Sequence, residues 1–454
     1  MPPKNEGKHF IKEKIKDKPL NKKKVLHKGI ATIGYAILFG FVSCLVFCVL
    51  RPIMEPWFAP EQDQWIGIPK DTRADDESQA DDTAADTEPQ QDQAKEDADK
   101  KKKEKQTVYV TEKKAMTLDD YQVLQNQLYR IGNQVNKSIV TVTGVKEVNN
   151  IFDSPYEAAG QASGLIIGSS SKELLILTEY SVIADVKSIR VTFLKDDTLE
   201  SELKKYDGNT GLTLDAKLKK YDGNTGIAVL GVPLENISEE VMNHIEIAVL
   251  GNSLNLRQGK MVVALGSPLG TNYSILTGNI TSVSNTISTA DFDYTVFTTN
   301  IVSNTKGNGV LINTDGEVIG LFLKSSNIQK EENTLTAVSI SELKDIIELL
   351  SNGVNIPYIG IKGKTVTDDI SQEYEIPKGV YIKETVVNSP AMTAGIQTGD
   401  VIEAIDGKKI YTMEDYQKTL LSLQRGDEVK ITVNRQGTKE YKKYNCVVEV
   451  GVLK

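Results

Sequence analysis

The spacing of apolar residues changes along the 454-residue chain, and each spacing predicts a different kind of structure. Residues 29–50 form an apolar run of 22 residues without a charge. Between 118 and 135, apolar side chains recur every three or four positions, which indicates an amphipathic helix. From 138 onward, short β-branched runs alternate with Gly, Asn and Asp, which indicates many short strands and a mainly β fold. A helix over 340–350 closes this region.

The apolar run at 29–50 is long enough to cross a membrane. As a helix it would measure about 33 Å, against about 30 Å for a bilayer core. Residues 1–28 carry ten Lys against three acidic residues, and such a basic flank stays on the cytoplasmic side. We therefore expect a basic cytoplasmic tail over 1–28 and a single transmembrane helix over 29–50 in the cell membrane. The alternative interpretation is a buried helix of a soluble domain.

An acidic region separates this helix from the predicted strands. Glu61–Lys100 contains 14 Asp and Glu residues against four Lys and Arg, and almost no large apolar residue after Ile68. Such a segment buries too little apolar surface to offset the entropy of ordering it. We expect a disordered linker over 51–115, followed by extracytoplasmic domains over 116–352 and 353–454.

One nine-residue segment occurs twice. Leu203–Gly211 is repeated unchanged as Leu218–Gly226, which is too few copies for a solenoid and predicts a lengthened loop or hairpin. Its Asp-Gly-Asn-Thr-Gly resembles the opening of a calcium loop. The other oxygen ligands and the closing Glu are absent at the required spacing, which favours a turn. We expect no metal and no cofactor, and the net charge of −9 offers no basic face for nucleic acid.

Several motifs follow one another between residues 138 and 350. They are Gly164-Leu-Ile-Ile-Gly168, Leu175-Ile-Leu-Thr-Glu-Tyr-Ser-Val-Ile183, Gly226-Ile-Ala-Val-Leu230, Ala264-Leu-Gly-Ser-Pro-Leu-Gly270, Thr277-Gly-Asn-Ile280 and Asn313-Thr-Asp-Gly-Glu-Val-Ile-Gly320. In this order they resemble the HtrA/Deg-type trypsin-like serine proteases. The resemblance implies a trypsin-like double β-barrel of two six-stranded barrels, with the active site in the cleft between them.

The same resemblance implies a degenerate catalytic triad. Ser181 stands where the family has its base His, Gly226 where it has Asp, and Gly307 where it has the nucleophilic Ser. Thr305 replaces a Gly of the oxyanion loop. Serine catalysis needs a base within hydrogen-bond reach of the hydroxyl, and His244 is the only His after the expected span. His244 is expected at the entry to a strand, beside no Ser-rich Gly loop. We therefore expect no functional catalytic residue.

The C-terminal motifs resemble a bacterial PDZ domain of the HtrA type, an α+β fold. They are Tyr358-Ile-Gly-Ile361, Gly379–Thr385, Ser389–Ile396, Gly399–Ile402 and Ile405–Lys408. The resemblance implies that a peptide adds to a sheet edge while backbone N–H groups of Tyr358, Ile359, Gly360 and Ile361 hold its terminal carboxylate. The alternative is that the side chains of Tyr358 and Ile361 only pack under the PDZ helix.

These observations favour a membrane-anchored HtrA-like pseudoprotease. It would bind C-terminal or extended peptides, or misfolded proteins, through its PDZ domain, in surface sensing, scaffolding or quality control. Two alternatives stay open. One is an active HtrA-type serine endopeptidase of envelope protein quality control, which labelling with a fluorophosphonate would reveal. The other is an inactive subunit of a hetero-oligomer with a catalytic paralogue; a homotrimer is the other assembly that the resemblance suggests.

Overall fold

The computed structural model describes residues 38–40, 43, 65–72, 117–147, 156–193, 212–304, 307–323 and 333–453. The chain divides into two compact units, Met1–Asp63 and Gln64–Lys454, and the second contains every strand described below. The predicted tail at 1–28 and most of the predicted span at 29–50 lie outside the described residues. Within the described residues, no helix is both long and apolar enough to cross a membrane.

The first six strands close into a barrel in the order β1-β2-β3-β6-β5-β4. These strands are β1 (Ile139–Glu147), β2 (Tyr156–Ser169), β3 (Glu173–Glu179), β4 (Ser188–Phe193), β5 (Thr213–Tyr221) and β6 (Ile227–Pro233). In β4, buried side chains alternate with more exposed ones, as expected of a strand with one face on a core. Val140, Ile176 and Leu230 are buried in the interior. The short helix α4 (Tyr180–Ile183) lies between β3 and β4, and α6 (Glu239–Met242) lies in the connection from β6 to the next barrel.

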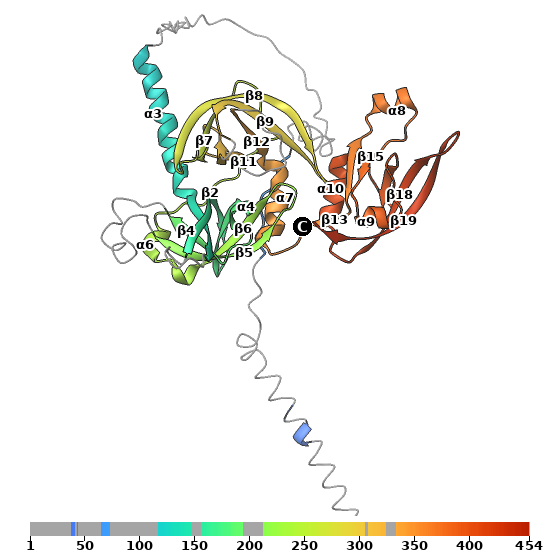
Figure 1. The fold of residues 1–454 in the computed structure, drawn as a ribbon, viewed down its shortest axis with the longest axis horizontal. Coiled ribbons are helices and arrows are strands. Elements are labelled where there is room, and N and C mark those ends of the chain that lie inside the picture. Colours follow the sequence, from blue (N-terminus) through green and yellow to red (C-terminus); the bar gives the residue numbers. More distant parts are fainter. Residues whose placement is uncertain are drawn as a thin grey trace, which may run out of the picture. The chain divides into compact units, whose positions relative to one another are not determined.

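Six further strands form a second closed barrel, in the order β10-β11-β12-β9-β8-β7. They are β7 (Met261–Ser267), β8 (Ser274–Ser288), β9 (Asp293–Val302), β10 (Asn308–Ile312), β11 (Val318–Phe322) and β12 (Thr334–Ser339). Two barrels in succession confirm the mainly β, double-barrel fold. Figure 1 shows the first barrel in green and the second in yellow, with the long β8–β9 hairpin curving over it.

Two helices accompany the barrels. α3 (Leu118–Val135) begins with a capping box, in which the Thr117 hydroxyl accepts from the N–H of Asp120 and the Asp120 carboxylate accepts from the N–H of Thr117. This is the helix start that the sequence predicts. Gly132 on α3 lies against Ile275 of β8, so the helix contacts the second barrel (Figure 1). α7 (Ile340–Ser351) follows β12.

Residues 65–72 lie against α7, although the sequence places them in a disordered linker. The indole N–H of Trp65 donates to Glu348 at 3.0 Å, and the Asp71 carboxylate accepts from Lys344 at 2.8 Å. The expectation of disorder is therefore wrong for these eight residues. The prediction considered this segment by itself, whereas its partners lie some 280 positions away: polar contacts with α7 are joined by Ile66 and Ile68, which pack against the core. Residues 73–116 lie outside the described residues.

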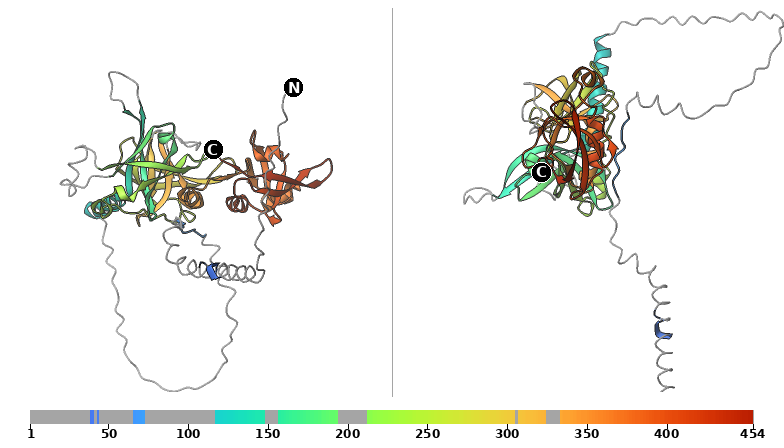
Figure 2. Two further views of the ribbon diagram at one scale, coloured as in Figure 1. Left: turned by 90° about the horizontal axis from the view of Figure 1, so that it is seen from below. Right: turned by 90° about the vertical axis from the view of Figure 1, so that its right-hand side faces the viewer.

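The C-terminal region is a separate group of strands and helices, coloured orange to red in Figure 2. Its main sheet has the order β14-β15-β16-β18-β19, with β17 paired to β16, and β13 pairs with β20. The strands are β13 (Pro357–Tyr358), β14 (Ile361–Thr365), β15 (Val380–Thr385), β16 (Val401–Ile405), β17 (Lys408–Lys409), β18 (Glu428–Gln436), β19 (Tyr441–Glu449) and β20 (Gly451–Val452). The helices are α8 (Asp368–Tyr374), α9 (Pro390–Thr393) and α10 (Met413–Leu421).

Candidate functional site

Two of the three predicted triad positions, Ser181 and Gly226, lie next to each other in the first barrel. Ser181 is in α4, directly after β3, and Gly226 directly precedes β6. The N–H of Tyr180 donates to the carbonyl of Gly226 at 2.7 Å, which fixes α4 against this turn. The Tyr180 ring also stacks on Tyr221 at the end of β5, with ring centroids 3.8 Å apart. The fold thus brings together two positions that are 45 residues apart in sequence.

The third position, Gly307, directly precedes β10 of the second barrel. A small cavity of about 20 Å³ is lined by residues from both barrels, among them Glu179, Ile227 and Asn308. Each of these residues is within two positions of one triad position. The neighbourhoods of all three positions therefore meet at the boundary between the barrels, where the resemblance expects the cleft. Thr305, at the oxyanion-loop position, lies outside the described residues.

The backbone at Gly307 lies tightly against the loop that follows β7. A Cβ atom at residue 307 would come within 2.4 Å of the carbonyl oxygen of Pro268 and 2.7 Å of Ser303 Oγ. These separations are shorter than any van der Waals contact, so this conformation has no room for a side chain. Ser303 Oγ itself donates to the Pro268 carbonyl at 3.1 Å. As folded, the loop presents no hydroxyl at residue 307 and has no space for one.

A chain of hydrogen bonds crosses from one barrel to the other beside this loop. The Asn308 side-chain oxygen accepts from the N–H of Ser163 at 2.8 Å, and Ser163 Oγ donates to Asn272 at 2.6 Å. The Asn272 amide then donates to Thr141 Oγ1 at 2.5 Å. The Ser163 hydroxyl is thus bound to an amide oxygen, which is no general base. The sequence pattern gives no signal for this network, because its members are scattered over β1, β2, β10 and a loop.

His244 lies in a connection between the barrels. It follows α6, and its N–H donates to the carbonyl of Val241 at 3.0 Å. The expected strand entry is wrong at this position, because residues 245–249 contain no strand. The three triad positions lie in α4, in the turn at Gly226 and in the loop at Gly307. His244 lies in none of these elements.

The loop Tyr358–Ile361, predicted to bind a carboxylate and called the carboxylate-binding loop below, has the geometry of an anion site. The N–H groups of Ile359, Gly360 and Ile361 all donate to one carboxylate, that of Asp291, at 2.8, 2.7 and 3.0 Å. Gly360 has a φ of +91°, and a Cβ there would lie 2.3 Å from Ser389 Cβ, so only glycine fits. The side chain of Ile361 is fully buried in the core, as the packing alternative expects, whereas Tyr358 is half-buried.

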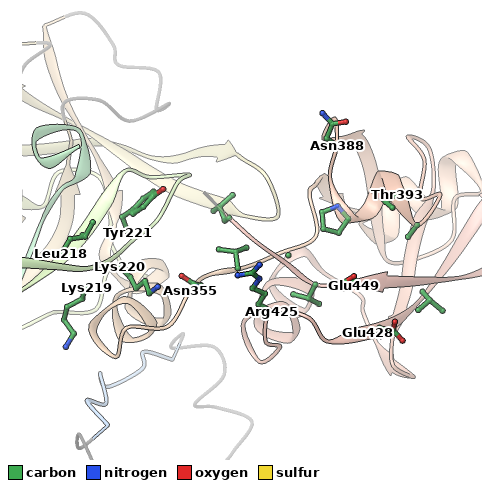
Figure 3. Close-up of a pocket in the computed structure, with 17 residues that line it drawn as sticks. Leu218, Lys219, Lys220, Tyr221, Asn355, Asn388, Thr393, Arg425, Glu428 and Glu449 are labelled. Atoms are coloured by element: carbon green, nitrogen blue, oxygen red, sulfur yellow. The ribbon is translucent and has the colours of Figure 1, made fainter. Parts of the chain in front are cut away.

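A larger groove lies between β5 and the C-terminal strands. It measures about 860 Å³, and its lining includes Lys220, Tyr221, Arg425 and Glu449. Figure 3 shows these side chains approaching the groove from both sides. Its lining contains both positive and negative groups and none of the three triad positions. The groove therefore gives no support for a catalytic role.

Comparison with solved structures returns HtrA-type proteases. The structure described as HtrA-type protease AlgW with decapeptide is 18% identical, with a TM-score of 0.49, and the match covers 72% of this chain and 98% of that one. A serine endoprotease from Yersinia pestis is 21% identical, with a TM-score of 0.44, 72% of this chain and 98% of that one being covered.

Sequence comparison finds HtrA-type serine proteases, and two family models match separate parts of the chain. Serine protease Do-like HtrA of Lactobacillus helveticus is 29% identical over 300 residues, or 62% of this chain and 67% of the relative. Serine protease Do-like HtrB of Bacillus subtilis (strain 168) is 29% identical over 339 residues, or 68% of each chain. Residues 162–321 match the trypsin-like peptidase domain, and residues 357–443 match the PDZ domain. The chain therefore carries a trypsin-like peptidase domain followed by a C-terminal PDZ domain, and it is similar to HtrA-type serine proteases.

Proposed function

We propose that the chain is a membrane-anchored HtrA-like pseudoprotease that binds peptides or misfolded proteins through its PDZ domain. The observation that carries the proposal is Gly307, which stands at the nucleophile position with no space for a side chain. Ser181 and Gly226 in turn offer neither the base nor the orienting carboxylate. Without a triad, binding and an oxyanion hole alone leave about 10³–10⁴-fold acceleration over water, which is too little for proteolysis.

Peptide binding is supported by the PDZ domain. Three N–H groups of the carboxylate-binding loop converge on one carboxylate, which is the contact that a peptide C-terminus requires. β14, which follows this loop, stands at the end of the strand order, so a peptide strand can pair with it. The proposed ligands are therefore C-terminal or extended peptides, including those exposed by misfolded proteins.

The proposed setting is the outer face of a membrane. The uncharged run at 29–50 and the Lys-rich residues before it support an anchor with a cytoplasmic N-terminus. The linker over 51–115 would then carry the domains at 116–352 and 353–454 outside the cytoplasm. There the chain would act in sensing, scaffolding or quality control. Assembly as a homotrimer, or with a catalytic paralogue, is part of the same proposal.

The second candidate is an active HtrA-type serine endopeptidase of envelope protein quality control. Its support is the naming of the relatives, which are serine proteases and include the probable periplasmic serine endoprotease DegP-like of Pseudomonas fulva, 28% identical over 55% of its length. This candidate needs a nucleophile and a base outside the three triad positions.

Activity assays on the full-length chain in mild detergent separate the two candidates. We expect no cleavage of unfolded casein and no labelling by a fluorophosphonate, with a triad-containing HtrA protease as the positive control. Cleavage that persists unchanged in Gly307→Ala would establish a different active site and reject the pseudoprotease.

In parallel, we expect decapeptides with a free terminal carboxylate to bind more tightly than the same peptides with an amidated end. Co-purification of a triad-containing protein would support the hetero-oligomer.

A further inference from the structure

A four-residue loop of the second barrel reaches the PDZ domain. This β8–β9 loop (Thr289–Phe292) is closed by a hydrogen bond from the N–H of Thr289 to the carbonyl of Phe292 at 2.8 Å. Figure 1 shows the β8–β9 hairpin ending beside α10. Asp291, in the loop, has a φ of +65°, an uncommon conformation for a residue with a side chain. The loop geometry thus directs one carboxylate toward the PDZ domain.

Asp291 is fully buried and accepts from three of the four backbone N–H groups of the carboxylate-binding loop, those of Ile359, Gly360 and Ile361. Oδ2 accepts from the N–H of Ile359 at 2.8 Å and of Gly360 at 2.7 Å, and Oδ1 accepts from the N–H of Ile361 at 3.0 Å. The hydroxyl of Tyr416 on α10 also donates to Oδ1, at 2.7 Å. Burial raises the pKa of Asp291, and these four hydrogen bonds act in the opposite direction.

The backbone of Asp291 adds a contact of the kind that a bound peptide makes. Its N–H donates to the carbonyl of Ile361 at 2.6 Å, where β14 begins. A peptide that joins the edge of β14 through its last residue would use this carbonyl and the same three N–H groups. Two carboxylates cannot share three N–H donors without a severe loss of hydrogen bonds and a repulsion between like charges.

Contacts on the barrel side hold the loop in this position. The side-chain amide of Asn224 donates to the carbonyl of Ala290 at 2.9 Å. Phe292 is buried and stacks on Tyr294, with ring centroids 6.0 Å apart. On the PDZ side, Gln417 of α10 donates to the carbonyl of Asp293 at 3.2 Å. The Asp291 carboxylate is therefore presented by a structured hairpin with partners on both of its sides.

We propose that Asp291 is an internal ligand of the PDZ domain, occupying the carboxylate-binding loop in place of a peptide C-terminus. A peptide can bind the loop only after Asp291 has left it. The apparent Kd for a peptide therefore equals the intrinsic Kd divided by the fraction of molecules in which the loop is free of Asp291. Displacement also removes contacts between the second barrel and the PDZ domain. The inference rests on the proposed function in one respect, namely that the loop binds peptide carboxylates.

The test compares peptide binding by the full-length wild-type chain and by Asp291→Ala. The probes are fluorescein-labelled decapeptides with a free carboxylate and one of the twenty residues at the C-terminus, each with an amidated twin. We expect Asp291→Ala to bind the free-carboxylate peptides at least about tenfold more tightly than wild type, with little change for the amidated twins. Tyr416→Phe removes one hydrogen bond to Asp291 and should give a smaller gain in the same direction.

Asp315→Asn is the matched control. It removes the same charge from an exposed turn of the same barrel and should bind like wild type. Equal binding of free-carboxylate peptides by wild type, Asp291→Ala and Tyr416→Phe would overturn the inference. Circular dichroism of each variant shows whether it is folded, and Tyr416→Phe, which keeps the buried ring, provides the comparison if Asp291→Ala does not fold.

Amide hydrogen exchange separates the internal ligand from the proposed function. We expect the amides of Ile359, Gly360 and Ile361 to exchange at least about tenfold faster in Asp291→Ala than in wild type, because their acceptor is gone. Unchanged exchange would overturn the inference. If neither protein binds any peptide while exchange accelerates, the peptide-binding function is rejected and the occupation of the loop by Asp291 is supported.

Discussion

The carboxylate of Asp71 accepts a hydrogen bond from the ammonium group of Lys344 at 2.8 Å, and this ion pair is largely buried. The Lys344 side chain is 3% exposed and that of Asp71 is 12% exposed. Ser341 Oγ donates to the same carboxylate at 2.6 Å. The segment at 65–72 is therefore attached to α7 through a pair in which neither charge has ready access to water.

Replacing Asp71 by Ala should destabilise the fold markedly. Lys344 would stay buried without its counter-charge, and a loss of about 3 kcal/mol in the free energy of unfolding is expected. Urea unfolding of the full-length chain measures this loss. Lys70→Ala is the control, because Lys70 is 53% exposed and its pair with Asp345 should contribute less than about 1 kcal/mol. Equal losses in the two variants would show that burial adds nothing to the contribution of the Asp71–Lys344 pair.

Arg435→Ala should destabilise the PDZ domain. The Arg435 guanidinium donates two hydrogen bonds of 2.7 Å to Asp400, whose side chain is 1% exposed, and a third to the carbonyl of Gly395. Without the guanidinium, the buried Asp400 carboxylate loses two hydrogen-bond donors and its counter-charge. We expect the free energy of unfolding to fall by about 3 kcal/mol. Thermal unfolding measures it, with Lys378→Ala as the control at an exposed ion pair. A loss no greater than that of the control would count against this role.

Gly307→Ser should not restore proteolysis. The new Cβ would lie within 2.4 Å of the Pro268 carbonyl, so the loop must shift or strain, with a cost of about 1–3 kcal/mol. The same change combined with Ser181→His and Gly226→Asp should also leave casein uncleaved, because residue 307 still has no space for a side chain and the φ of +76° at Gly226 is uncommon for a residue with a side chain. Casein cleavage and urea unfolding are the measurements. A single Gly307→Ser variant that is as stable as wild type would show that the loop has more room.

Acid should remove one stabilising interaction of the PDZ domain. Hydrogen bonds from Lys409 and Lys443 lower the pKa of Glu403 from its usual 4.5 to about 2. A carboxyl whose pKa is lowered by folding adds stability above its unfolded pKa. The contribution is therefore present above pH 4.5 and is lost as the pH falls toward about 2.

Glu403→Gln tests this interaction. At neutral pH the variant should be less stable than wild type by on the order of 1 kcal/mol, because both Lys partners are more than half exposed. The difference should shrink toward zero near pH 2. Urea titrations at neutral and acidic pH measure it, and Glu384→Gln, at an exposed pair, is the control. A difference that stays constant with pH would contradict the lowered pKa.

Local chemistry made some features predictable from sequence. The helix starts at Thr117 and Thr412 are capping boxes in the structure, because an Asp three residues later returns the hydrogen bond, and this Thr-x-x-Asp spacing is readable in the sequence. The predicted turn of Asp222–Gly226 is also present: the Asp222 carboxylate accepts from Asn224 and Thr225. The first copy of the repeat, at 203–211, lies outside the described residues. Motif order predicts the three triad positions, and residues next to each of them line one small cavity between the barrels.

Contacts between distant segments were not predictable in the same way. Thr-Ala-Asp-Phe at 289–292 has the composition of an ordinary hairpin turn, and the N–H groups that bind Asp291 are 68 to 70 residues further along the chain. Glycine at residue 307 is visible in the sequence, but its close approach to Pro268 depends on how two loops pack. The attachment of residues 65–72 to α7 is hidden for the same reason.

The turn Asp222–Gly226 contacts both the β8–β9 loop and α4, so it can couple ligand binding at the PDZ domain to ligand binding between the barrels. Asn224 donates to the residue before Asp291, and the Gly226 carbonyl accepts from the residue before Ser181. Coupling between two binding sites is reciprocal in free energy. If a peptide that displaces Asp291 shifts this turn, it changes the affinity of the cleft between the barrels for any ligand there. That ligand must then change the affinity of the PDZ domain for the peptide by the same factor.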